Sequence, residues 1–170
     1  MHGDLKPSNI MIKRTGTIKL IDLGSAVSVC SAAHRRMWSP AYAAPEILEG
    51  DENSPRADLA SLGYIVVEML SGRSSFDGLT TRGELLAAKR TFERDFPAWL
   101  PLDVRRNDLL VYLCRRLVAY EPAQRFPTAQ AAYQDPGGVA DFHRQLVKCD
   151  LSSEYETDVR VWLEQVDPGY

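Results

Sequence analysis

The chain has 170 residues, of which 45% are hydrophobic and 25% are charged, and its net charge at pH 7 is −3. These values are ordinary for one globular domain with its own core, and the weak negative charge argues against a nucleic-acid-binding surface. The longest apolar run, residues 62–70, contains Glu68 and is too short to cross a bilayer. The three cysteines lack metal-binding spacing, so we expect a reduced, cytoplasmic protein without a membrane span.

A β-hairpin is predicted near the N-terminus. Residues 9–13 (NIMIK) and 17–21 (TIKLI) are rich in β-branched and apolar side chains. Gly16 lies in the RTG between them and can adopt the positive φ of a tight turn. Residues 22–45 then contain small residues, serines and prolines without a regular period, which indicates a long loop.

The remainder of the chain is predicted to be helical, so the expected fold class is mainly α (α+β). Asp58 is placed to N-cap a helix that is buried nearly all round and ends at Gly72. The apolar spacing predicts further helices over residues 81–90, near 108–118 and over 139–147.

The tail has its own helical pattern. Ser153 and Glu156 form a capping-box pair ahead of apolar residues at helical spacing. The Asp-Pro-Gly-Gly sequence at 135–138 breaks the helical pattern before it. We therefore expect a domain over residues 1–135 and a C-terminal helical extension over 136–170, which is a possible site for a partner.

The hairpin predicts where polar side chains converge. Asn9 enters its first strand and Asp22 leaves its second, so the two lie at the same end of an antiparallel pair. Asp4 and Lys6 arrive from the loop just before the first strand. Carboxylate and amide oxygens of this kind suit Mg²⁺ that shares phosphate ligands, and a neighbouring lysine suits a transferring phosphoryl group.

Five motifs, in order, resemble those of eukaryotic-type serine/threonine protein kinases. HGDLKPSN at residues 2–9 resembles the catalytic loop H-R-D-x-x-x-x-N, and Asp22-Leu23-Gly24 resembles D-F-G. Residues 44–46 match A-P-E, while Asp58, Ser61 and Gly63 resemble the family's D-x-W-S-x-G. Arg125, in EPAQRF, is similar to the arginine that pairs with the A-P-E glutamate. The resemblance covers residues 2 to about 135 and implies the C-terminal lobe of a kinase, a helical bundle whose hairpin carries the catalytic loop.

The resemblance also implies roles. Asp4 would orient the substrate hydroxyl and accept its proton, and Lys6, typical of serine/threonine-directed kinases, would contact the γ-phosphate. Asn9 and Asp22 would hold Mg²⁺, and the ATP-binding residues would be Lys6, Ser8, Asn9 and Asp22.

Further residues would be structural or would face the substrate, which would be a protein Ser or Thr hydroxyl. Glu46 and Arg125 would form a buried pair, and Asp58 would hold the backbone of the catalytic loop. Ser39 would contact Asp4, and His2 is expected to be a packed scaffold residue.

Gly3 is one departure from the family pattern, because an arginine that pairs with an activation-segment phosphate is usual there. Activation is therefore expected not to depend on phosphorylation of Ser25, Ser28 or Ser31.

A second departure is that the sequence has no G-x-G-x-x-G and no V-A-I-K-like strand, which the N-terminal lobe of a kinase supplies. We expect a kinase lobe truncated at its catalytic loop, with weak or no activity on its own and an exposed apolar surface. The alternatives are a non-catalytic, kinase-like binding module and, because HGD also resembles aminoglycoside and choline kinases, a small-molecule phosphotransferase.

Overall fold

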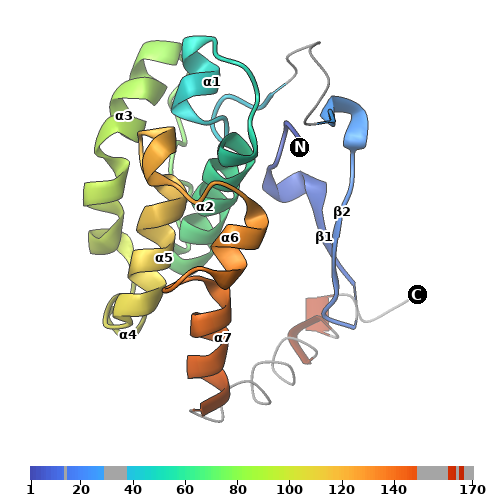
Figure 1. Cartoon of the computed structure of the whole chain (residues 1–170), viewed down its shortest axis with the longest axis vertical. Coiled ribbons are helices and arrows are strands. Elements are labelled where there is room, and N and C mark those ends of the chain that lie inside the picture. Colours follow the sequence, from blue (N-terminus) through green and yellow to red (C-terminus); the bar gives the residue numbers. More distant parts are fainter. Residues whose placement is uncertain (14, 29–37, 149–160, 164, 167–170) are drawn as a thin grey trace.

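The computed structural model describes residues 1–13, 15–28, 38–148, 161–163 and 165–166. A body of helices lies on one side of Figure 1, the β1–β2 hairpin lies on the other, and the N-terminus lies between them. This arrangement is the mainly α fold with a small hairpin that the sequence predicted.

The hairpin is antiparallel and consists of β1 (Ile10–Ile12) and β2 (Ile18–Leu20). Ile10 lies opposite Leu20, and Gly16 adopts a φ of 78° in the turn. The predicted hairpin is thus confirmed, with strands shorter than the five-residue runs suggested. Short 3-10 turns flank it, η1 (Pro7–Asn9) before β1 and η2 (Leu23–Ser25) after β2.

The helical body follows in chain order. Its α-helices are α1 (Pro45–Glu49), α2 (Pro55–Ser71), α3 (Arg82–Asp95), α4 (Leu102–Arg105), α5 (Asp108–Val118), α6 (Ala129–Gln134) and α7 (Val139–Lys148), with 3-10 turns η3 (Phe96–Trp99) and η4 (Pro122–Gln124). The predicted helices near 108–118 and over 139–147 are found at nearly the same bounds. The helix predicted over 81–90 extends to Asp95, behind a capping box formed by Thr81 and Glu84.

Two helices form the centre of the core. A Cβ added at Gly63 of α2 would lie 2.7 Å from both Leu117 and Val118 of α5, so the missing side chain lets the two backbones approach closely. Tyr64 packs edge-on against Phe76 and Phe92, with ring centroids 5.0 and 5.2 Å away. α2 is therefore buried over most of its length, as predicted, although Met69 near its end is exposed.

The predicted start of α2 is wrong. Ser54 is the N-cap, its hydroxyl accepts a hydrogen bond from the amide of Ala57 at 3.3 Å, and Pro55 is the first helical residue. Asp58 lies inside the first turn instead. Gly72 does end the helix, with a φ of 65°.

The region predicted as a loop over 22–45 contains the η2 turn, and α1 begins at its last residue, Pro45. Within the described residues, none of the helices is both long and apolar enough to span a membrane. The capping box predicted at Ser153 and Glu156 lies outside the described residues.

Candidate active site

The loop that carries Asp4 is held by the first turn of α2. The carboxylate of Asp58 accepts hydrogen bonds from the amides of His2 at 2.7 Å and Gly3 at 2.9 Å. The ring of His2 is buried; Nδ1 accepts from the Asp4 amide at 3.4 Å and Nε2 faces the Ile21 carbonyl at 3.1 Å. The expectations that Asp58 holds this loop and that His2 is a packed scaffold residue are both confirmed.

Asp4, Lys6 and Ser39 form a compact polar cluster. The ammonium of Lys6 donates to Asp4 Oδ2 at 2.8 Å and to the hydroxyl of Ser39 at 3.1 Å. The other oxygen of Asp4 accepts from the Ser39 amide at 2.8 Å. The predicted contact of Ser39 with Asp4 is therefore present, across 35 residues of sequence.

The same contacts keep Asp4 ionised. Partial burial acts to raise the pKa of Asp4, but hydrogen bonds from Lys6 and Ser39 outweigh it, and the pKa is lowered below its ordinary value of 3.8. At neutral pH the carboxylate is an acceptor only, so it can bind the hydrogen of an approaching hydroxyl.

Asn9 and Asp22 meet at one end of the hairpin. The amide of Ile21, directly before Asp22, donates to the Asn9 carbonyl at 3.0 Å and continues the ladder beyond β2. The side-chain amide nitrogen of buried Asn9 donates to the Asp4 carbonyl at 2.9 Å, which leaves its Oδ1 as an acceptor. Asp22 is exposed with a φ of 58°, and its Oδ1 accepts from the Gly24 amide at 3.3 Å.

These oxygens fit a magnesium ion that arrives with phosphates. In the described part of the chain, no group of three or more His, Cys, Asp or Glu side chains is placed to hold a metal. One carboxylate and one amide oxygen are too few for an all-protein site but suffice for Mg²⁺, which keeps waters and shares phosphate oxygens. Ser8 precedes Asn9 in η1 and is exposed at this end of the hairpin.

Residues 38–44 form a segment, here called the Ser39 segment, that is tied to α2 as well as to Asp4. The hydroxyl of Tyr42 donates to Glu68 at 3.0 Å, and the hydroxyl of Ser61 donates to the Tyr42 carbonyl at 2.8 Å. Burial and the neighbouring Glu68 raise the pKa of Tyr42 to about 12, so its hydroxyl stays a donor at neutral pH. Sequence reasoning did not single out Tyr42 or Glu68.

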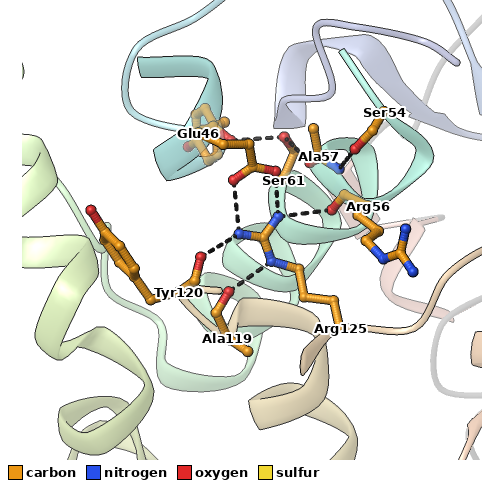
Figure 2. A network of polar contacts seen from close by, with 9 residues as sticks. Glu46, Ser54, Arg56, Ala57, Ser61, Ala119, Tyr120 and Arg125 are labelled. Carbon is orange, nitrogen blue, oxygen red and sulfur yellow. Dashed lines mark hydrogen bonds and ion pairs between the residues drawn. The ribbon is translucent and has the colours of Figure 1, made fainter. Parts of the chain in front are cut away.

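The predicted Glu46–Arg125 pair is confirmed (Figure 2). The guanidinium is fully buried and donates to both carboxylate oxygens, at 2.7 and 2.9 Å. It also donates to the carbonyls of Arg56, Ala119 and Tyr120. The pair joins α1 to the loop after α5 and so supports the Ser39 segment, which leads into α1.

Gly3 fits its position because it lacks a side chain. Its φ is 82°, and an added Cβ would lie 2.7 Å from the Ser25 carbonyl oxygen. The catalytic loop and the turn after Asp22 therefore pack against each other backbone to backbone.

Comparison with known proteins agrees with this geometry. The model of the protein kinase domain matches residues 1–136. The chain belongs to the protein kinase family. This match favours protein kinases over the small-molecule phosphotransferases considered as an alternative.

Curated relatives carry serine/threonine kinase names. A serine/threonine-protein kinase SIK3 homolog of Danio rerio is 30% identical over 94% of this chain and 14% of its own length. An Aurora kinase of Schizosaccharomyces pombe is 33% identical over 76% of this chain and 35% of its length. A probable serine/threonine-protein kinase of Clostridium perfringens is 32% identical over 79% of this chain and 20% of its length. The chain thus spans between 14% and 35% of these relatives.

Proposed function

We propose that this chain supplies the catalytic loop and the metal-holding residues of a protein serine/threonine kinase. The reaction is transfer of the γ-phosphoryl group of ATP to a protein Ser or Thr hydroxyl. The observation that carries the proposal is the Asp4 carboxylate, held between Lys6 and Ser39 beside Asn9.

Asp4 has the geometry of a group that orients an attacking hydroxyl. Its lowered pKa makes it a weak base, so it binds the hydroxyl hydrogen first and takes the proton as the oxygen forms its bond to phosphorus. The Ser39 amide keeps the carboxylate in place throughout, because that amide belongs to the segment that would face the acceptor protein.

Lys6 can serve the transferring group without leaving Asp4. An ammonium has three N–H donors, and Asp4 and Ser39 accept two of them, so the third is available to a phosphate oxygen. Asn9 Oδ1 and the Asp22 carboxylate would hold Mg²⁺, with Ser8 and Lys6 beside the phosphates. A bound magnesium would neutralise the charge that develops on the phosphate oxygens.

We also propose the division of the chain into a kinase C-lobe over residues 1–135 and a helical extension over 136–170. The turn between them contains Gly137 with a φ of 77°, and the amide of Gly137 donates to Asp141 at 2.7 Å. α7 then packs against α5 and α6.

The test is phosphate transfer from labelled ATP to a mixture of Ser- and Thr-containing peptides, with Mg²⁺ and the 170-residue chain. Asp4→Asn keeps the size of the side chain but removes its charge, and the expected rate falls at least about 100-fold. Asp103→Asn, an exposed aspartate of α4, is the matched control and should leave the rate unchanged. Transfer that is equally fast in Asp4→Asn would contradict the proposal.

The alternative is a non-catalytic, kinase-like binding module, which the lack of a G-x-G-x-x-G sequence in these 170 residues favours. Calorimetric titration with Mg–ATP separates the two functions. The kinase proposal expects binding that requires Mg²⁺ and weakens in Asp22→Asn. A folded chain that binds no Mg–ATP would support the binding module.

A further inference from the structure

Lys89 of α3 lies where a core residue would be expected. Leu85, Lys89, Phe92 and Phe96 recur at the spacing of one helix face, and all four are buried. Lys89 has no exposed surface, whereas lysines are almost never fully buried unless they are paired. Among the described residues, no carboxylate forms an ion pair with it.

The partner of Lys89 is a backbone carbonyl. Its Nζ donates to the carbonyl of Ala41 at 2.6 Å. The rings of Tyr64 and Phe76 lie 3.9 and 3.7 Å from the same nitrogen, so aromatic faces from α2 and the loop after it enclose the donor. Burial lowers the pKa of Lys89 well below 10.5, but the ammonium and the neutral amine both donate, so the hydrogen bond persists in either form.

Ala41 is the centre of the Ser39 segment. Two residues earlier, the Ser39 amide donates to Asp4, and one residue later, the Tyr42 hydroxyl donates to Glu68. The hydrogen bonds to Asp4 and Lys6 come from the catalytic loop, and those to Glu68 and Ser61 come from α2. Lys89 adds a third support, from α3.

We propose that Lys89 is a positioning residue for the acceptor protein, because its hold on the Ala41 carbonyl sets the Ser39 segment against Asp4. An apolar residue would fill the same space at a lower desolvation cost, but it would leave the buried carbonyl without a donor. The role rests on the proposed kinase function, since the segment positions a substrate only if Asp4 receives one.

Amide hydrogen exchange of the 170-residue chain tests the hold directly and requires no turnover. The amides of Tyr42 and Ala43 both donate to the Ser39 carbonyl at 3.0 Å and report on the segment. In Lys89→Met, which keeps the volume and removes the donor, these two amides should exchange about tenfold faster while those of α5 are unchanged. Leu85→Met, a methionine on the same buried face of α3, is the matched control and should leave the segment as in the wild type.

Unchanged exchange at Tyr42 and Ala43 in Lys89→Met would overturn the proposal. Equal acceleration in every helix would do the same, because it would show a general loss of stability. If Lys89→Met does not fold, Lys89→Leu is the second variant, and unfolding of both would show that Lys89 serves the whole fold rather than the segment.

The phosphate-transfer assay gives a second readout. Where the wild type turns over, Lys89→Met should raise the KM for peptide about tenfold and leave the KM for ATP unchanged. An unchanged peptide KM would overturn the positioning role. A wild type without transfer contradicts the activity of this chain instead, and the exchange result still decides whether Lys89 holds the segment.

Discussion

Replacement of Arg125 by methionine should strongly destabilise the protein. The guanidinium donates to both carboxylate oxygens of Glu46 and to the backbone carbonyls of Arg56, Ala119 and Tyr120. Methionine fills much of the space but donates nothing. The change leaves one buried carboxylate without its partner and three carbonyls without a donor.

The expected loss follows from these contacts. Removing one partner of a buried ion pair costs about 3–5 kcal/mol, and each orphaned carbonyl acts in the same direction. Part of this is recovered by relaxation, so we expect the free energy of unfolding to fall by about 4 kcal/mol. Since domains are stable by only about 5–15 kcal/mol, urea unfolding at pH 7, followed by circular dichroism, should show the midpoint move to much lower urea.

A double variant separates the orphaned charge from the lost packing. Arg125→Met with Glu46→Leu removes both charges, and it should be more stable than Arg125→Met alone by about 2 kcal/mol. Arg94→Met, an exposed arginine of α3, is the control and should change stability by less than about 0.5 kcal/mol. A loss below about 1 kcal/mol in Arg125→Met, or a double variant that is no better, would refute the reasoning.

Two further predictions concern the catalytic loop. Gly3→Ala should cost about 1–2 kcal/mol from its positive φ plus the clash with the Ser25 carbonyl, whereas Gly16→Ala, at a similar φ with nothing within 4 Å, carries the strain alone. Equal losses by urea unfolding would exclude the clash. Because the pKa of Asp4 is lowered in the folded state, its stabilisation is present above about pH 4 and is lost as pH falls through the folded-state value. Carboxyl NMR titration should give a midpoint below 3.8 that rises in Lys6→Met; a midpoint unaffected by this change would contradict the role of Lys6.

The sequence predicted best the elements that local pattern specifies. The helix near 108–118 has leucines on one face at 110, 113 and 117, and its bounds agree with α5. The hairpin was equally readable, because two apolar runs flank a turn that contains Gly16. Motif order placed Asp4, Lys6 and Asn9 together, and the structure brings their polar groups within hydrogen-bonding reach.

The misses have a common physical cause, which is contact between residues distant in sequence. Asp58 has the chemistry of an N-cap but instead binds amides more than 50 residues away, and Ser54 caps the helix. α1 has only five residues, and its Glu46 pairs with an arginine 79 residues later. Lys89 could have been noticed as a charged residue on an otherwise apolar face of α3, but its carbonyl partner could not.

The anchoring of the first residues on Asp58 has a consequence for the order in which structure is lost. The catalytic loop joins α2 through two amide hydrogen bonds that close a span of more than 50 residues, and the hairpin beyond it is largely exposed. α2 and α5, by contrast, are joined by buried apolar packing. Local opening will therefore begin at the hairpin end, and the proposed chemistry will vanish while the helical signal is still nearly complete.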